Sequence, residues 1–163
     1  MSSQKITIHN VWVEKTDELI QEIISFWNQY NAIPPSEDIV KRAKQVVIVA
    51  RNANNQIIGV TTSYLTDYPT LKNNLFVFRG MISPVYRVPG LFIKITKETI
   101  QVLETYSKSI GEEDRPIGLI AEMENPHLKS VGSTKTPSGM TLIGFSKKDN
   151  PIYVYYFKGA RFN

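Results

Sequence analysis

Segment 82–92 constrains the fold of this chain more than any other, and it reads Ile-Ser-Pro-Val-Tyr-Arg-Val-Pro-Gly-Leu-Phe. An apolar run typical of a strand precedes it, and a long amphipathic stretch typical of a helix follows it. Pro84 ends the strand's ladder of hydrogen bonds, because proline supplies no N–H. The free N–H groups of the next helical turn and the helix dipole favour an anion there. The sequence therefore predicts a strand–turn–helix unit that can hold a phosphate group.

The rest of the chain mixes strands and helices unevenly. Alternating or β-branched runs predict strands over 6–13, 46–50, 57–64, 75–83, 117–123, 140–145 and 152–157, with a hairpin turn at 52–55. Helical spacing predicts helices after an N-cap at Thr16, over 37–44 after an N-cap at Ser36, and over 89–109; Asn125 begins a segment with a further helical turn. This order predicts an α/β fold with a mixed sheet and helices on both faces. The 163 residues show no linker or repeat, so we expect one domain, 1–163.

Composition excludes several kinds of site and partner. The chain has no cysteine, which excludes disulfides, thiolate nucleophiles and Cys-based zinc sites and fits a reducing cytoplasm. His9 and His127 lie far apart in the sequence, so we expect no metal site. The net charge of +4 suits an anionic ligand, but the basic residues are not clustered, so we expect no nucleic-acid partner. No run approaches the ~18 apolar residues of a membrane span, and no secretory signal is visible, so we expect a cytoplasmic protein.

The pattern Ile82-x-Pro84-x-x-Arg87-x-x-Gly90-Leu91 resembles the GNAT superfamily of N-acetyltransferases. The cofactor motif of that family is (Gln/Arg)-x-x-Gly-x-(Gly/Ala), and it opens the helix after the fourth strand. Residues 87–92 stand in those places, and Gly144-Phe145 resembles the Gly-Phe that follows the family's fourth helix. The order of elements is similar over nearly the whole chain. Because the motif is short, an ordinary strand–turn–helix junction without a ligand stays open as an alternative.

The resemblance implies a mostly antiparallel sheet of about seven strands and a transfer of acetyl from acetyl-CoA to an amine by direct attack. The pyrophosphate would lie on the N–H groups of 87–92, and the pantetheine would run beside the preceding strand as an added strand does. An N–H near Ile82 would polarise the thioester carbonyl. The acceptor would be a small-molecule or peptide amine, with 31–36 at its rim, and family members are often dimers, which implies a homodimer. The implied cofactor residues are Met81, Ile82, Ser83, Arg87, Val88, Pro89, Gly90, Leu91, Phe92 and Asn125.

Glu122 and Glu124 are the candidate catalytic residues. They stand two apart at the end of the predicted strand 117–123, which puts both side chains on one side. The resemblance places this strand beside the active cleft, so we expect one carboxylate to be the general base for the acceptor amine. Two close carboxylates would also raise the pKa of one of them. A solvated strand end, or pairing of both with Lys or Arg, stays open as the alternative.

Two residues depart from the family pattern. Phe92 takes a place that is usually Gly or Ala, and Met140 stands where the family often has a tyrosine that protonates the leaving thiolate. Segment 132–139 is also too rich in Gly, Ser, Thr and Pro for a long fourth helix. The runner-up function is therefore a GNAT-like CoA-binding or regulatory module without catalysis. A nucleic-acid-binding α/β domain rests only on the isoelectric point and ranks last.

The orientation of Phe92 follows from the periodicity of the predicted helix 89–109. Thr96 and Thr99 lie on the same helical face as Phe92, one position around from the main apolar stripe. Phe92 is therefore expected at the edge of the buried face, where it flanks the cradle without filling it. The residues of the expected apolar stripe are Ile93, Ile100, Leu103 and Tyr106.

Overall fold

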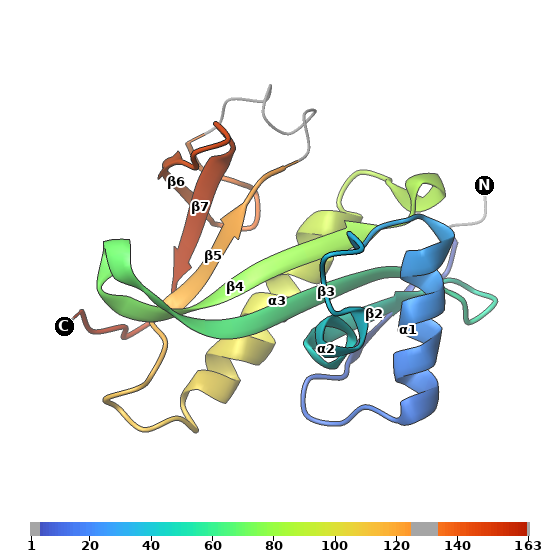
Figure 1. The fold of residues 1–163 in the computed structure, drawn as a ribbon, viewed down its shortest axis with the longest axis horizontal. Helices are drawn as coiled ribbons and strands as arrows, with labels where there is room; N and C mark the ends of the chain where they lie inside the picture. The colour runs from blue at the N-terminus through green and yellow to red at the C-terminus, as the bar shows by residue number, and fades with distance from the viewer. Residues whose placement is uncertain (1–3, 125–133, 163) are drawn as a thin grey trace. The chain divides into compact units, whose positions relative to one another are not determined.

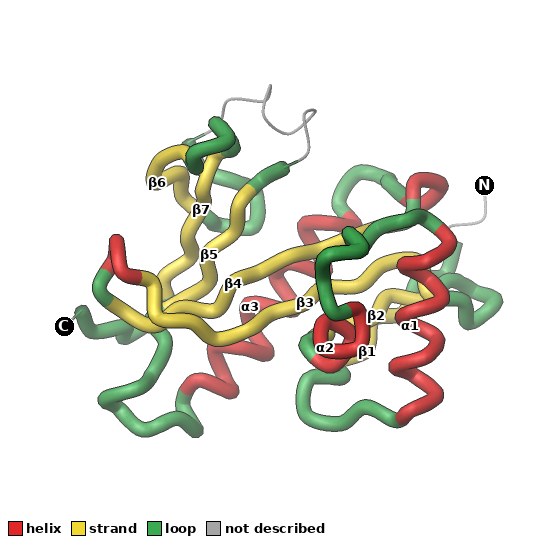
Figure 2. Tube along the Cα trace, in the orientation of Figure 1, coloured by secondary structure: helices red, strands yellow, loops and turns green. Residues whose placement is uncertain are grey.

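The computed structural model describes residues 4–124 and 134–162 (Figure 1). Figure 2 marks the helices, strands and loops along the trace. In chain order the elements are β1 (Thr7–Asn10), α1 (Asp17–Gln29), α2 (Ile39–Lys44), β2 (Val46–Arg51), β3 (Ile57–Tyr68), the 3-10 turn η1 (Pro69–Leu71), β4 (Asn73–Ile82), the 3-10 turn η2 (Pro84–Tyr86), α3 (Leu91–Ser107), β5 (Gly118–Glu122), β6 (Thr141–Phe145) and β7 (Pro151–Tyr156).

The strands form a seven-stranded sheet in the order β1-β2-β3-β4-β5-β7-β6. The pairs β1–β2, β2–β3, β5–β7 and β6–β7 are antiparallel, and β4–β5 is parallel. The predicted fold class, a mixed and mostly antiparallel sheet with helices, is thus confirmed. None of the described helices is both long enough and apolar enough to cross a lipid bilayer.

The fold divides into two compact units. The first unit comprises Met1–Ser63 and Gly80–Val102. The second comprises Tyr64–Arg79 and Leu103–Asn163. The long strands β3 and β4 and the helix α3 each contribute residues to both units.

Helices cover both faces of the strands in the first unit. Val60 of β3 packs in the core that α1 and α2 form, whereas the next residue, Thr61, is fully buried against α3. The hydroxyls of Thr61 and Thr99 are 2.7 Å apart, and Thr99 donates to the Ile95 carbonyl, which leaves Thr61 as the donor of the pair. In Figure 1 α1 and α2 lie in front of these strands and α3 lies behind them. The core beneath α1 and α2 contains Ile20, Ile23, Phe26, Trp27, Ala43, Val46, Val49 and Val60.

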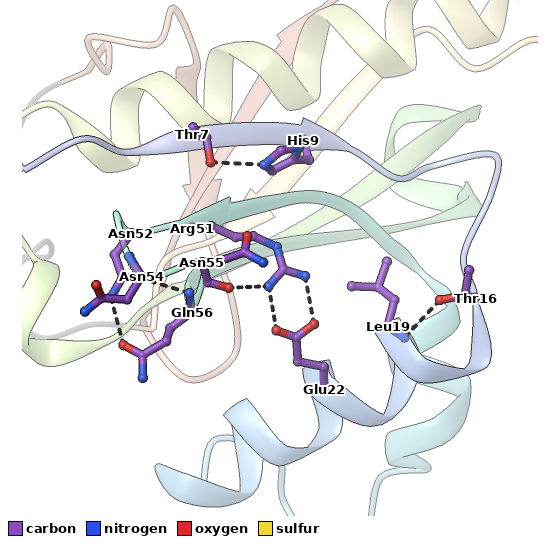
Figure 3. A network of polar contacts seen from close by, with 10 residues as sticks. All are labelled: Thr7, His9, Thr16, Leu19, Glu22, Arg51, Asn52, Asn54, Asn55 and Gln56. Carbon is purple, nitrogen blue, oxygen red and sulfur yellow. Dashed lines mark hydrogen bonds and ion pairs between the residues drawn. The ribbon is translucent and has the colours of Figure 1, made fainter.

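The helix starts are set by side-chain caps. The predicted N-cap of α1 is confirmed, because the Thr16 hydroxyl accepts from the Leu19 N–H at 3.1 Å (Figure 3). The predicted start of α2 is wrong. Its cap is Asp38, which accepts from the Lys41 N–H at 3.0 Å, and the helix begins at Ile39. The Glu37 N–H instead bonds to the Pro34 carbonyl, so a separate turn precedes the helix.

The apolar stripe expected on α3 is confirmed at Ile100 and Leu103 and wrong at Ile93 and Tyr106. Leu91, Ile95, Thr96, Thr99, Ile100 and Leu103 are buried, whereas Ile93 is half-buried and Tyr106 is 39% exposed. The two threonines can face the core because each hydroxyl donates to a carbonyl one turn earlier, Thr96 to Phe92 and Thr99 to Ile95, both at 2.7 Å. Phe92 is half-buried on the same side as Thr96.

The second unit is built on β5, β6 and β7. Leu75, Ile117, Ile120 and Val154 form one core cluster. The Phe76 ring packs against Tyr106 and Phe157, with ring centroids 6.4 and 6.3 Å apart. The predicted closing hairpin of β6 and β7 is confirmed, and the Ser146 N–H closes its turn on the Asn150 carbonyl. The further helical turn expected after Asn125 lies outside the described residues.

An ion pair joins α1 to the end of β2 and makes stability depend on pH. Arg51 donates to both carboxylate oxygens of Glu22, at 2.5 and 2.7 Å (Figure 3). This hydrogen bonding holds the pKa of Glu22 below its ordinary value. A lowered carboxyl pKa contributes stability above the unfolded pKa, and that stability is lost as pH falls through the folded value.

We therefore expect Glu22→Gln to lower the free energy of unfolding at pH 7 by less than about 1 kcal/mol, because the pair is partly exposed. The difference from wild type should shrink as the pH falls towards about 3, because protonation of Glu22 removes the charge that pairs with Arg51. Urea unfolding at the two pH values measures it. Glu14→Gln, at an exposed position, is the control. A deficit of equal size at both pH values would contradict this role for Glu22.

Candidate functional site

The predicted order of strand, turn and helix is present between β4 and α3. After β4 ends at Ile82, the 3-10 turn η2 carries the chain round to α3, which begins at Leu91. The Tyr86 N–H bonds to the Ser83 carbonyl at 3.0 Å, and the Val88 N–H bonds to the Tyr86 carbonyl at 2.7 Å. These short-range bonds fold 83–88 into a compact turn that leaves residues 87–90 exposed.

Arg87 bends back over the strand end. Its Nε donates to the Ile82 carbonyl at 3.2 Å, while the residue as a whole stays exposed. This bond gives the last carbonyl of β4 a donor and fixes the Nε end of the guanidinium group. The two terminal nitrogens of a guanidinium are donors that suit phosphate oxygens.

Gly90 supplies the conformation that opens α3. Its φ is +89°, in the left-handed region that side chains disfavour, and a Cβ built at this position would meet no atom within 4 Å. The side of Gly90 that a side chain would occupy is therefore open to a ligand. Because α3 starts at the next residue, the turn brings this open side to the helix N-terminus.

The first turn of α3 offers N–H groups to an anion. Its first α-helical bond joins the Lys94 N–H to the Gly90 carbonyl at 2.9 Å. Within the described part of the chain, the N–H groups of Gly90 and Ile93 have no backbone partner. Leu91 turns inward and is 6% exposed, which anchors the start of the helix. The first turn of α3 can therefore bind a negatively charged group.

The residues at the end of β4 are largely buried. Ile82 and Ser83 are 5% and 2% exposed, and Met81 is half-buried. The Ser83 N–H is already bonded to the Ile58 carbonyl of β3, at 2.8 Å. The parallel ladder between β4 and β5 comprises Phe76↔Leu119 and Val77↔Ile120, and β4 continues beyond it to Ile82.

The two candidate carboxylates lie in the second unit, whereas the turn lies in the first. Glu122 is the last residue of β5 and is exposed, and its Oε1 accepts from Asn150 Nδ2 at 2.8 Å. Glu124 is exposed and lies beyond the end of β5, so the expectation that both stand on the strand is wrong. Asn150 is 5% exposed, so Glu122 is held by a fixed amide.

The other predicted positions differ in their surroundings. Asn125 lies outside the described residues. Met140 is fully buried, and its N–H bonds to the Thr136 hydroxyl at 3.0 Å. Residues 134–140 form a turn in place of a helix. Among residues 4–124 and 134–162, no three acidic or histidine side chains gather as metal ligands do.

Sequence reasoning missed one contact of the turn. The Tyr86 hydroxyl accepts from Asn52 Nδ2 at 2.9 Å, and Asn52 belongs to the turn between β2 and β3. The sequence marks Asn52 as a turn residue and places Tyr86 inside the motif segment, but it carries no signal that joins the two. Only the strand order brings these residues together.

Comparisons with known proteins bear on the fold. No protein-family model and no curated protein matches the sequence. Solved structures do match, among them an acetyltransferase of the GNAT family from Streptococcus pneumoniae, at 14% identity and a TM-score of 0.59 over 94% of this chain and 99% of that one. Arabidopsis thaliana NAA60 in complex with acetyl-CoA matches at 12% identity and a TM-score of 0.61 over 95% of this chain and 100% of that one.

A third match is the ribosomal-protein-S5-alanine acetyltransferase from Vibrio fischeri, at 12% identity and a TM-score of 0.62 over 99% of this chain and 98% of that one. The similarity therefore spans nearly the whole length of each protein, although few residues are identical. At such identities the match defines the fold. This chain has the fold of the GNAT acetyltransferases.

Proposed function

We propose that this protein is an acetyl-CoA-dependent N-acetyltransferase. The observation that carries the proposal is Gly90, whose left-handed backbone opens α3 and whose Cβ side is empty. A glycine at this point allows a phosphate to approach the backbone N–H groups closely. A fold that is shared with an acetyl-CoA complex supports the same reading.

Residues 87–92 would hold the pyrophosphate, and Arg87 would add charge through its terminal nitrogens. Beyond its ladder with β5, the backbone of β4 would pair with the pantetheine arm through Met81 and Ile82. Ser83 can offer at most its carbonyl, because its N–H is bonded to Ile58. Acetyl-CoA supplies a thioester whose carbonyl carbon is the electrophile. No atom of Phe92 lies within 4 Å of the Cβ position at Gly90, so its ring leaves this open side accessible.

The acceptor amine must lose its proton to attack, and we assign that task to Glu122 or Glu124. Glu122 fits the role better, because Asn150 fixes one of its carboxylate oxygens. We expect Gln in place of the true base to lower kcat by ~10²–10⁴ at neutral pH while the affinity for acetyl-CoA is kept. Glu113→Gln, at an exposed position, is the control. Wild-type turnover by both Glu122→Gln and Glu124→Gln would leave these carboxylates without a catalytic role.

One observation favours the second candidate function, a CoA-binding module without catalysis. Met140 is fully buried where the resemblance expects a tyrosine acid, so no proton donor stands at that position. Water or another residue would have to protonate the leaving thiolate in an active enzyme.

A thiol-release assay separates the two functions. The chain has no cysteine, so every thiol detected in the assay comes from CoA. The amine panel comprises a polyamine, an aminoglycoside, free amino acids and a peptide that begins with alanine. The peptide follows from the match to an enzyme named for the alanine of a ribosomal protein. Amine-dependent thiol release supports the transferase, and binding of acetyl-CoA without release on any amine supports the module.

A further inference from the structure

Asn52 is held by a complete set of hydrogen bonds at the turn between β2 and β3. Its Oδ1 accepts from the N–H groups of Asn54 and Gln56, both at 3.0 Å. Its Nδ2 donates to Gln56 Oε1 at 3.0 Å and to the Tyr86 hydroxyl at 2.9 Å. An amide has two donor hydrogens and an acceptor oxygen with two lone pairs, so this pattern fixes its orientation. Figure 3 shows the part of this network within the turn.

The strand order places this amide next to the phosphate turn. Strand β2 pairs antiparallel with β3, so the turn that joins them lies where β3 begins. The Ser83 N–H bonds to the Ile58 carbonyl near that start, which puts the end of β4 beside the same turn. Tyr86, three residues further on, is half-buried and reaches Asn52.

Ser83 is tied to β3 through Ile58, but the other hydrogen bonds that the described structure shows for residues 84–88 are local. The N–H groups of Tyr86 and Val88 bond within the turn, and Arg87 bonds back to Ile82. Short-range bonds fold a turn but do not tie it to the rest of a structure. The bond from Asn52 spans 34 residues of sequence and ties the middle of the turn to a hydrogen-bonded amide that is 8% exposed.

We propose that Asn52 and Tyr86 are positioning residues for acetyl-CoA. Their hydrogen bond holds 84–90 in the conformation that presents the N–H groups at the start of α3, such as those of Gly90 and Ile93, to the pyrophosphate. Neither Asn52 nor Tyr86 needs to touch the ligand. A turn that is preorganised in this way loses less conformational freedom when the ligand binds. The inference rests on the proposed function, because it concerns how the same turn is held in place to bind acetyl-CoA.

Tyr86→Phe tests the inference with the smallest possible change, since it deletes only the hydroxyl and Asn52 Nδ2 keeps Gln56 as a partner. We expect the Kd for acetyl-CoA to rise about 3- to 10-fold, the scale of one neutral hydrogen bond. The kcat with a working amine should stay unchanged. Hydrogen exchange of 84–92 in the free protein should become faster. Tyr156→Phe is the matched control, because within the described residues its hydroxyl has no hydrogen-bond partner.

A double-mutant cycle with Asn52→Ala separates positioning from general destabilisation. If the bond carries the effect, the double variant should bind acetyl-CoA no more weakly than Asn52→Ala alone. If the two substitutions lower the affinity independently, so that their fold-losses multiply in the double variant, the inference is wrong. The inference would also be wrong if Tyr86→Phe kept the wild-type affinity for acetyl-CoA and the wild-type hydrogen exchange of 84–92 while Gly90→Asp lost acetyl-CoA binding. If wild-type protein binds no acetyl-CoA, the proposed function fails, and this inference fails with it even if exchange of 84–92 rises.

Discussion

Gly90→Asp should weaken acetyl-CoA binding by about 100-fold or more while the protein stays folded. The new carboxylate would stand on the open side of Gly90, beside the negative charges of the pyrophosphate. Like charges about 4 Å apart repel by roughly 1 kcal/mol in water and roughly 4 kcal/mol near a protein surface, and ~2.7 kcal/mol corresponds to that loss. Titration calorimetry with acetyl-CoA measures the affinity.

The matched control is Gly159→Asp. Gly159 has a φ of +74° and a Cβ position with no atom within 4 Å, so the same residue in the same backbone region meets the same local strain. Both variants should lose about 1–3 kcal/mol of stability from that strain. Only Gly90→Asp should lose affinity. If the two variants bound acetyl-CoA with equal affinity, the turn would not be part of the cofactor site.

Gly118→Ala should be the most destabilising small substitution in the second unit. Gly118 pairs with Tyr156 across the β5–β7 ladder, and a Cβ there would overlap the Tyr155 carbonyl oxygen. A backbone atom cannot swing away as a side chain can, so the two strands would have to separate locally. We expect a loss of about 3 kcal/mol or more in the free energy of unfolding, measured by urea denaturation.

Gly111→Ala is the control for this prediction. A Cβ at Gly111 meets nothing within 4 Å, and the backbone there is not left-handed. It should therefore be neutral or slightly stabilising, because alanine reduces the freedom of the unfolded chain. If Gly118→Ala were as stable as Gly111→Ala, Gly118 could not lie as close to the Tyr155 carbonyl as the structure places it.

The sequence predicted those features of the fold that depend on residues close together in the chain. Thr16 caps α1, Pro84 ends β4, and the apolar runs form the strands. These features depend on propensity, caps and alternation, which can be read within a few residues. The fold class followed from their order and was confirmed by the sheet.

Prediction failed where two local arrangements were both acceptable and where a contact joins residues far apart in the sequence. The stripe on α3 was right at Ile100 and Leu103 but missed Thr96 and Thr99, whose hydroxyls bond to carbonyls of the helix itself and so can pack inward. The start of α2 was wrong because two acceptable caps, Ser36 and Asp38, stand close together and only the turn at Pro34 selects one. The bond between Asn52 and Tyr86 depends on strand order, which no short segment encodes.

The central claim is that the turn before α3 holds the pyrophosphate of acetyl-CoA, and amide NMR of the ¹⁵N-labelled protein tests it most directly. Titration with acetyl-CoA should shift the N–H signals of Gly90, Leu91, Phe92 and Ile93 most, because these groups would donate to or border the phosphates. ADP, which shares the diphosphate but lacks the pantetheine arm, should shift the same signals. Saturable binding of acetyl-CoA that leaves 87–93 unshifted would contradict the account.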